Sequence, residues 1–342
     1  MEGQPKVGPH FLRNSSISIF YLAGYNPLEH MNLAAAFLRL IRWPNLFFIA
    51  LTQVLFYFLI ILPAFHPTAL ETYQNRLHPN EFFLLSLSSV LIAAAGYIIN
   101  DYFDLDIDRV NKPRRLVVEK HIRRRWTIFW HWILSLTGLL IGVYVSWKIR
   151  NALIVFSHIS CIVLLWFYST TFKKKLLVGN IIISLLTAWV ILILYVCEFR
   201  VGVVYNPAYH HILSRLFKFA ILYAGFAFII SLVREVVKDI EDMEGDARYQ
   251  CRTMPVVWGV QVSKIFIATW IIVLTASLLI LQVYMLQSGW WWTVLYCMAL
   301  IILPLGFILQ KLYHSATPQD YHRLSSLIKA VMFTGILSII FF

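Results

Sequence analysis

The stretch LLSLSSVLIAAAGYIINDYFDLDID, residues 84–108, joins a long apolar run to a group of aspartates. Its first part, residues 84–99, has no charged side chain and nearly the length of a helix that crosses a lipid bilayer. Four aspartates follow within eight residues, namely Asp101, Asp104, Asp106 and Asp108. The stretch therefore predicts a transmembrane helix with an acidic end, where carboxylates are costly unless they have a function.

The composition of the whole chain is typical of a membrane protein. Of its 342 residues, 60% are hydrophobic and only 13% are charged, whereas about 25% of the residues of a soluble protein are charged. No Gly-, Ser- or Pro-rich linker divides the apolar runs, and residues 1–30 lack the pattern of a signal peptide. We expect an N-terminal segment, 1–30, followed by a single transmembrane domain, 31–342.

Apolar runs of suitable length predict an all-α protein with about nine transmembrane helices in one bundle. The predicted spans lie near residues 43–63, 81–99, 126–147, 151–168, 177–197, 216–233, 262–285, 290–310 and 324–342. Ahead of them, Met31–Arg42 has an apolar helical face. Two interpretations of this segment remain open: a separate helix lying in the membrane interface, or an extension of the first span.

The distribution of Lys and Arg predicts the orientation of the bundle. These residues are far more frequent in the N-terminal segment and in every second loop after it than in the other loops. Because positive loops stay in the cytoplasm, we expect the N-terminus and both acidic segments to be cytoplasmic in a multi-pass protein of the cell membrane. The net charge of +12 then reflects topology and attraction to anionic lipids, and nucleic acid is not an expected partner.

Ten of the 17 acidic residues lie in two short stretches, each of which follows a predicted span. The first stretch holds the four aspartates named above. The second holds Glu235, Asp239, Glu241, Asp242, Glu244 and Asp246. Three aspartates recur in each at positions i, i+3 and i+7, which would align them on one face if the helix continued. A solvated loop end explains one such run, but two runs with matching spacing favour a functional site.

Carboxylates one helical turn apart repel each other, so a positive partner must stabilise them. Carboxylate oxygens suit a hard divalent cation, and Mg²⁺ commonly binds one or two carboxylates while phosphate oxygens and water complete its coordination. Basic residues adjoin both stretches and could bind the remaining phosphate oxygens. They are Arg109, Lys112, Arg114, Arg115, Arg234 and Lys238. Two facing carboxylate sets therefore predict a diphosphate site with Mg²⁺.

These residues resemble the motifs of the UbiA-type intramembrane prenyltransferases. Asn100-Asp101-x-x-Asp104-x-x-x-Asp108 is similar to the first aspartate motif of that superfamily. Arg234-Glu235-x-x-Lys238-Asp239-x-x-Asp242-x-x-Gly245-Asp246 is similar to the second. Smaller similarities are Arg42-x-x-Asn45, Tyr168-Ser169-x-x-Phe172-Lys173 and Gly179-Asn180. The resemblance covers nearly the whole chain from about residue 31.

The resemblance implies a helical bundle around a central cavity in which a polyprenyl diphosphate reacts with an acceptor. It implies that catalysis and Mg²⁺ binding depend on Asp101, Asp104, Asp108, Asp239, Asp242 and Asp246. It implies substrate binding by Asn45, Asn100, Arg109, Lys112, Arg114, Tyr168, Lys173, Arg234 and Lys238. Membrane lipids surround the domain as partners.

Two acceptors remain open on this resemblance. The second motif, with Thr253-Met254-Pro255 after it, is most similar to the branch that includes digeranylgeranylglyceryl phosphate synthase and chlorophyll synthase. This favours a prenylated glycerol phosphate such as geranylgeranylglyceryl phosphate, with an aromatic quinone precursor as the alternative. A transporter of lipid phosphates or ions would be a function of another class, but its coupling sites usually lie near the bilayer midplane.

One part of the chain departs from the family pattern. Many members continue after the first motif with Arg-Pro-x-x-x-Gly, whereas this chain has Arg114-Arg115-Leu116-Val117-Val118-Glu119-Lys120. Without the proline and glycine the chain lacks a rigid turn, so the geometry of this loop is open. The four cysteines show no paired spacing, so we expect neither a disulfide nor a zinc site. We expect His131 and His158 to be core histidines.

Overall fold

The computed structural model describes residues 32–65, 76–113, 116–199 and 207–342. The predicted N-terminal segment and the pair Arg114 and Arg115 lie outside the described residues. Within them the chain is almost entirely helical, and the single β-bridge, Val118 to Ile122, belongs to a short turn. The all-α prediction is therefore confirmed.

Nine helices of the described part are long and apolar enough to cross a membrane, as predicted. They run over Trp43–Phe65, Pro79–Phe103, Arg124–Ile149, Leu153–Thr170, Val178–Glu198, Tyr209–Glu241, Met254–Gln287, Trp291–His314 and Pro318–Phe341. Several exceed the predicted bounds because the helices continue through polar residues at their ends. Large apolar side chains on their outer faces are exposed, such as Trp132, Leu136 and Leu140. An outer surface of this kind is suited to lipid, and the chain is a multi-pass membrane protein.

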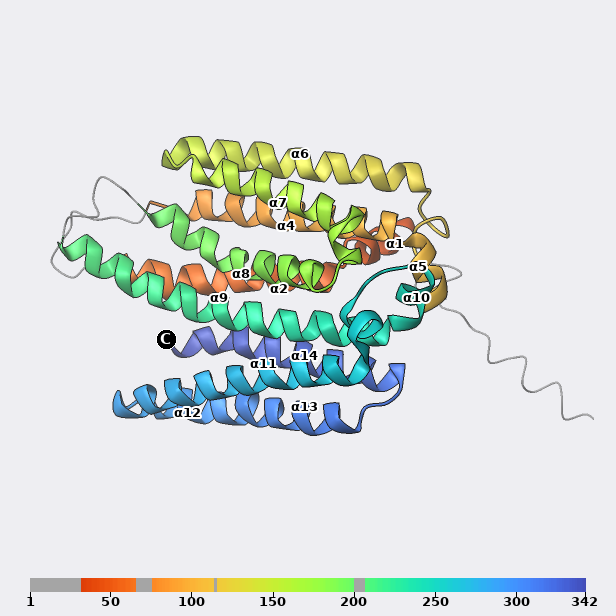
Figure 1. Cartoon of the computed structure of the whole chain (residues 1–342). Coiled ribbons are helices and arrows are strands. Elements are labelled where there is room, and N and C mark those ends of the chain that lie inside the picture. The colour runs from red at the N-terminus through yellow and green to blue at the C-terminus, as the bar shows by residue number, and fades with distance from the viewer. Residues whose placement is uncertain (1–31, 66–75, 114–115, 200–206) are drawn as a thin grey trace, which may run out of the picture.

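The labelled helices of Figure 1 subdivide these spans. They are α1 (Leu33–Leu40), α2 (Trp43–Phe56), α3 (Leu62–Phe65), α4 (Pro79–Phe103), α5 (Leu105–Asn111), α6 (Arg124–Ile149), α7 (Leu153–Thr170), α8 (Val178–Glu198), α9 (Pro207–Glu241), α10 (Met243–Arg248), α11 (Met254–Gln287), α12 (Trp291–Cys297), α13 (Leu303–His314) and α14 (Pro318–Leu337). A π-helical turn precedes α3 and another precedes α13. Pro63 and Pro304 follow these turns, and a proline has no N–H to continue the normal ladder.

The segment before the first span is a separate helix, so its interpretation as a simple extension is wrong. Helix α1 ends before Arg42, whose φ of 52° lies in the left-handed region. This residue turns the chain between α1 and α2. Ala36 and Leu40 of α1 pack against Ile98 of α4 in a small buried cluster.

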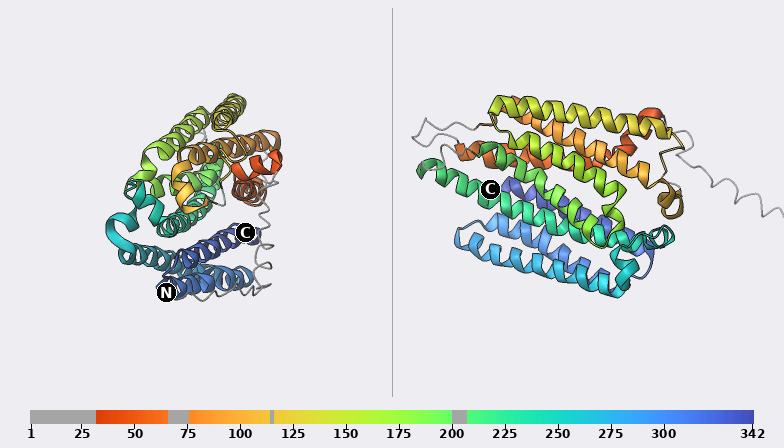
Figure 2. Two further views of the ribbon diagram at one scale, coloured as in Figure 1. Left: turned by 90° about the vertical axis from the view of Figure 1, so that its right-hand side faces the viewer. Right: turned by 45° about the horizontal axis from the view of Figure 1, so that its top comes forward.

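The helices form one bundle in which the two motif segments lie at the same end (Figure 1). Helix α5 packs against α10 there, although they are far apart in the sequence. Both views of Figure 2 show the same bundle, with the α11 to α14 helices on one side and the α6 and α7 helices on the other. Helix α9 packs against α8, α11 and α14, so it lies between α8 and the helices of the C-terminal side. At about 1.5 Å per residue, this 35-residue helix exceeds the ~30 Å hydrocarbon core of a bilayer.

Residues of α2, α4, α7, α8, α9 and α14 line a cavity of about 240 Å³ inside the bundle. Its inner walls are mainly apolar, with Ile92, Leu165 and Ile193 among them, while Asn100 and Arg234 belong to its polar end. The two motifs therefore occupy the polar end of an apolar cavity.

Candidate active site

Both motif helices bend at their middle aspartate. The sequence pattern was also compatible with straight helices, but the structure does not show them. Helix α4 passes into α5 at Asp104, with φ −84° and ψ −3°. Helix α9 passes into α10 at Asp242, with φ −95° and ψ 5°. The i to i−4 hydrogen bonds persist across each bend, for example from the Asp108 N–H to the Asp104 carbonyl at 2.8 Å. The register of the three aspartates is thus retained while each chain turns at the end of its span.

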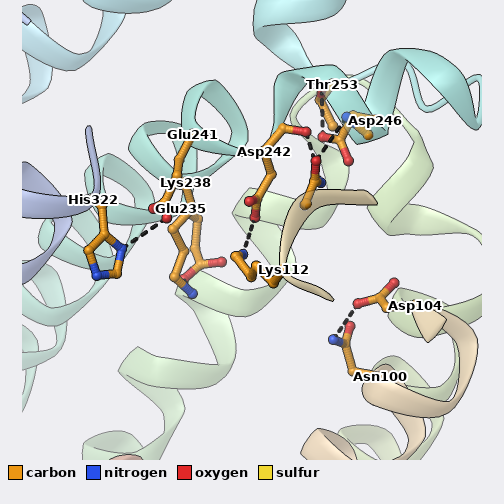
Figure 3. A network of polar contacts seen from close by, with 12 residues as sticks. Asn100, Asp104, Lys112, Glu235, Lys238, Glu241, Asp242, Asp246, Thr253 and His322 are labelled. Carbon is orange, nitrogen blue, oxygen red and sulfur yellow. Dashed lines mark hydrogen bonds and ion pairs between the residues drawn. The ribbon is translucent and has the colours of Figure 1, made fainter. Parts of the chain in front are cut away.

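The two motif segments are joined directly by Asn111 at the end of α5. Its Nδ2 donates to the Asp242 carbonyl at 3.0 Å, and its Oδ1 accepts from the Gly245 N–H at 2.9 Å. The next residue, Lys112, places its Nζ 2.5 Å from Asp242 Oδ2 (Figure 3). A Cβ on Gly245 would lie 2.4 Å from Asn111 Oδ1, so only glycine permits this approach. We call the Asn111, Lys112, Asp242 and Gly245 contacts the inter-motif latch.

Each aspartate of the first motif has a different surrounding. Arg42 places Nη2 2.6 Å from Asp101 Oδ1. Asp104 is buried, accepts from Asn100 Nδ2 at 2.6 Å, and forms an ion pair with Lys173. Burial, together with the neighbouring charge of Asp104, raises the pKa of the Asp108 carboxyl to about 6. The first motif therefore has two carboxylates that pair with protein cations and one, Asp108, whose pKa is raised.

In the second motif only one of the three aspartates pairs with a protein cation of the described residues. Asn180 Nδ2 donates to Asp239 Oδ2 at 2.8 Å, and Lys112 of the latch pairs with Asp242. Asp246 is buried and accepts from the Thr253 hydroxyl at 3.1 Å. Burial raises the pKa of Asp246 to about 6 against the opposing charge of Lys173. The last aspartates of the two motifs, Asp108 (half-buried) and Asp246 (buried), form no ion pair with a Lys or Arg of the described residues.

Lys173 lies between the motifs on the short 3-10 turn Phe172–Lys174, which joins α7 to α8. Burial lowers the pKa of its ammonium, but Asp104 and Tyr168 raise the pKa more, so that it stays well above the usual value. Its charge also acts on Asp108 of the first motif and on Asp246 of the second. One lysine therefore influences carboxylates of both motifs.

The turn that carries Lys173 is fixed by close packing and by the second motif's loop. A Cβ on Gly179 would lie 2.9 Å from the Lys173 Cα, so the start of α8 sits directly against the turn. The Arg252 N–H donates to the Lys174 carbonyl at 2.9 Å.

Several predicted substrate-binding residues line the cavity itself. These are Asn45, Asn100, Tyr168, Arg234 and Lys238. Glu235, also in the lining, lies 3.1 Å from Arg234 Nη1 and 3.2 Å from Lys238 Nζ. The polar end of the cavity therefore combines residues from both motifs with Asn45 and Tyr168 from other spans.

One predicted residue, Arg109, is not brought to this place. Arg109 pairs with Asp106 at 3.0 Å and with Glu119 at 2.5 Å, and its side chain is half exposed. Arg114 lies outside the described residues.

The loop 116–122, which follows the first motif, forms a turn without the family's proline and glycine. Glu119 takes a left-handed φ of 66°, and its N–H donates to the Ile122 carbonyl at 2.8 Å. Val117 and Ile122 are buried against α1, so apolar packing replaces the missing rigid turn.

The carboxylates suit a hard divalent cation by their chemistry. Burial raises the pKa values of Asp108 and Asp246, and a nearby cation would offset this by stabilising their ionised forms. Asn100 Oδ1 is a further oxygen that is buried without a hydrogen-bond partner. In the described part of the chain, no three His, Cys, Asp or Glu side chains gather closely enough to hold one ion alone. Phosphate oxygens would therefore have to supply part of the coordination, as Mg²⁺ sites commonly require.

Sequence reasoning assigned no site role to Arg42, Asn111, Asn180 or Lys329, all of which contact the site. Asn180 lay within a noted similarity, and Arg42 began another. Asn111 follows Asp108 at the spacing of one helical turn, which was the available signal for it. The signal for Lys329 was a lysine within an apolar span.

The histidines predicted to lie in the core, His131 and His158, are both buried, although His158 Nε2 has no hydrogen-bond partner among the described residues. His131 Nδ1 lies 3.0 Å from the Ala95 carbonyl and His158 Nδ1 lies 2.8 Å from the Ile154 carbonyl, both in buried positions. His158 also borders the cavity. All four cysteines are free thiols.

Comparison with known proteins finds a matching family model, similar relatives and similar solved structures. The sequence model of the UbiA prenyltransferase family matches residues 57–334. The digeranylgeranylglyceryl phosphate synthase of Methanosphaera stadtmanae is 25% identical over 280 residues, which cover 81% of this chain and 93% of that protein. The synthase of the same name from Methanobrevibacter smithii is 30% identical over 206 residues, covering 59% and 67%. The apo structure of a UbiA homolog from Aeropyrum pernix K1 matches with a TM-score of 0.59 and 14% identity, covering 91% and 98%. This last likeness concerns the fold.

Proposed function

This chain belongs to the UbiA prenyltransferase family, and we propose that it transfers a polyprenyl group from its diphosphate to a lipid phosphate acceptor in the membrane. The observation that carries this proposal is the inter-motif latch at the polar end of an apolar cavity. The latch, together with the Lys173–Asp104 ion pair, brings the two carboxylate sets and two lysines together where a diphosphate group would be bound. The neighbouring cavity suits a prenyl tail.

We propose that the six motif aspartates hold Mg²⁺ together with the diphosphate. They are Asp101, Asp104, Asp108, Asp239, Asp242 and Asp246. The metal would supply electrostatic stabilisation to the departing diphosphate. In the free protein, Lys112 and Lys173 are paired with Asp242 and Asp104. When the substrate is bound, these lysines would turn to phosphate oxygens and add to that stabilisation.

The remaining residues position the reaction and protect it. The bond between C1 of the prenyl group and the diphosphate oxygen breaks, and its electron pair leaves with the diphosphate. The acceptor hydroxyl oxygen forms the new C–O bond to C1 and gives its proton to the departing diphosphate. Tyr168 and Phe48 line the cavity, where their ring faces would stabilise positive charge on the prenyl group. Apolar walls exclude the water that would otherwise capture this cation.

The proposed acceptor is a prenylated glycerol phosphate of the geranylgeranylglyceryl phosphate class. Support comes from the relatives named digeranylgeranylglyceryl phosphate synthase, which include the two compared above. The chain spans nearly the full length of the first of these. An aromatic quinone precursor is the competing acceptor.

We also propose that the domain of residues 31–342 lies in the cell membrane with the motif end cytoplasmic. The excess of Lys and Arg in the loops at that end supports this orientation. A thiol-labelling scan outside the spans tests it. Labelling of an introduced cysteine at Arg109 by an impermeant reagent in intact cells would contradict it.

The test of the function uses purified protein, Mg²⁺ and radiolabelled geranylgeranyl diphosphate with a panel of acceptors. We expect diphosphate release and an ether product that depend on geranylgeranylglyceryl phosphate. Product formed only with aromatic acceptors would move the assignment to the competing acceptor. Release without any acceptor, or transport of an unchanged substrate into vesicles, would contradict prenyl transfer.

A further inference from the structure

Lys329 is a cation inside the last membrane span that no aspartate motif explains. It lies on α14, and its Nζ is 2.8 Å from Asn45 Oδ1 and 5.2 Å from the centre of the Phe48 ring. No carboxylate of the described residues forms an ion pair with it. Placing a lysine in a membrane span is costly and points to a functional use.

The surroundings of Lys329 carry a surplus of positive charge. The cavity is lined by four cationic side chains, Arg42, Arg234, Lys238 and Lys329, and by one carboxylate, Glu235. Asp101 neutralises Arg42, while Glu235 is shared by Arg234 and Lys238. Four cations against two carboxylates leave two uncompensated positive charges at the cavity wall. In a low dielectric this arrangement attracts an anion.

Arg234 provides a second and independent sign of a missing partner. Its Nη1 contacts Glu235, but its Nε is buried and has no hydrogen-bond partner. A buried donor of a charged group without a partner is costly. Arg234 and Lys329 both line the cavity, and within the described part of the chain neither has its full set of hydrogen-bond partners or a carboxylate of its own.

Lys329 supplies part of this surplus from outside both aspartate motifs. Lys112 and Lys173 are bound to Asp242 and Asp104, and neither lysine belongs to the cavity lining. Lys329 comes instead from α14, which packs against α2 and α9 and contains no motif residue. The cavity therefore has a place for an anion beside the diphosphate place, on the wall that α2, α9 and α14 share.

We propose that Lys329 and Arg234, with Lys329 held by Asn45, bind the phosphate monoester of the acceptor and select a phosphorylated lipid over a neutral alcohol. This inference rests on the proposed function. A phosphate monoester carries close to two negative charges near neutral pH, which matches the surplus. The phosphate and the reacting hydroxyl are on neighbouring carbons of glycerol. Binding the phosphate here would therefore hold that hydroxyl beside C1 of the donor.

The test compares Lys329→Met and Lys329→Arg with wild type, using geranylgeranylglyceryl phosphate and its dephosphorylated alcohol as acceptors. For Lys329→Met we expect the KM for the phosphorylated acceptor to rise about 10- to 100-fold, because the variant loses a hydrogen bond between two charged groups. The KM for the diphosphate donor and the activity with the alcohol should change little. Lys329→Arg should retain most of the preference for phosphate. The matched control is Lys311→Met, which removes an exposed lysine on α13 and should have no effect.

A binding measurement separates this inference from the catalytic proposal. Without donor or Mg²⁺, the phosphorylated acceptor should raise the melting temperature of wild type but not of Lys329→Met. The contrary result is that phosphatidylglycerol raises the melting temperature of wild type, relative to phosphatidylcholine, as much as the phosphorylated acceptor does. That result would assign the anion site to a bilayer lipid and overturn the inference. An unchanged preference for phosphate in Lys329→Met would also overturn it while leaving the prenyltransferase intact. If wild type uses no glycerol phosphate acceptor, the proposed function itself fails.

Discussion

Asp104 and Asp242 occupy equivalent positions in the two motifs, but their surroundings differ in burial. The Asp104 side chain is 6% exposed and lies between Asn100 and Lys173, whereas the Asp242 side chain is 23% exposed. Removal of the Asp104 charge would leave Lys173 without its partner in a largely buried place, which lowers stability as well as activity. Asp242 is therefore the better position for testing the chemistry alone.

We expect Asp242→Asn to lower kcat about 10²- to 10³-fold, the usual effect of removing one group that stabilises charge in the transition state. The thermal midpoint should change little, because the pair with Lys112 is partly exposed and contributes little to stability. The control is Asp106→Asn, which alters an exposed aspartate of the same stretch. Steady-state rates and thermal unfolding measure both effects. Equal losses in the two variants would contradict a specific role for Asp242.

The pKa values of Asp108 and Asp246 predict how Mg²⁺ activation depends on pH. Both are raised to about 6, mainly by burial. Above pH 6 the carboxylates are ionised and can bind a cation, and below it protons compete for them. The apparent Mg²⁺ affinity should therefore fall as the pH decreases through 6, by about tenfold per unit for each competing proton. Titrations of activity against Mg²⁺ from pH 7.5 to 5 measure this. The slope should be shallower in Asp246→Asn, and an unchanged slope would argue against competition at this carboxyl.

At the scale of elements, the inter-motif latch joins the ends of two long helices. Helices α4 and α9 each bend at an aspartate, and the short helices α5 and α10 then pack on each other. The side chain of Asn111 fills the space above Gly245 and bonds to backbone groups of the second motif. The relative position of the two carboxylate sets therefore depends on a small residue at Gly245.

Gly245→Ala should disrupt this latch because its Cβ would meet the Asn111 amide at 2.4 to 2.6 Å. We expect a loss of about 1–3 kcal/mol in the free energy of unfolding, the usual cost of overpacking, together with a loss of activity. Gly225→Ala on α9 is the matched control, since a Cβ there meets nothing within 4 Å. Denaturation and turnover of both variants test the prediction. A fully active Gly245→Ala protein would show that the latch is not required.

At the scale of the whole molecule, the cavity is formed where helices from both sides of the bundle meet. Six helices contribute to its lining, and among them α9 packs against both α8 and α14. Its polar end contains motif residues, while its interior contains apolar side chains such as Ile193 and Leu186. The length of the prenyl chain that fits is therefore a property of the assembled bundle.

Filling this interior should change the choice of donor. Ala93 lines the cavity from α4, so Ala93→Phe should raise the KM for geranylgeranyl diphosphate about tenfold relative to that for dimethylallyl diphosphate. The control Val163→Phe adds similar bulk at an exposed, lipid-facing position of α7. Kinetics with both donors measure the selectivity. The same preference in Ala93→Phe and wild type would mean that the prenyl tail lies elsewhere.

Much of this protein follows from local sequence. A membrane span depends on the length and polarity of one segment, so the nine spans were predictable to within several residues at their ends. The spacing of Asp101, Asp104 and Asp108, repeated in the second motif, likewise lies within a few turns of helix. Local patterns of this kind indicated the class of protein, the diphosphate chemistry and most of the candidate site residues.

Tertiary structure alone decided which of these residues meet. Asn111 contacts Gly245, and Lys173 pairs with Asp104. Lys329 donates a hydrogen bond to Asn45, which lies 284 residues earlier in the sequence. Arg109 adjoins the same motif in sequence but pairs with Glu119 away from the cavity. No local periodicity specifies contacts between segments so far apart, because they arise only when the apolar faces of all the helices are buried together.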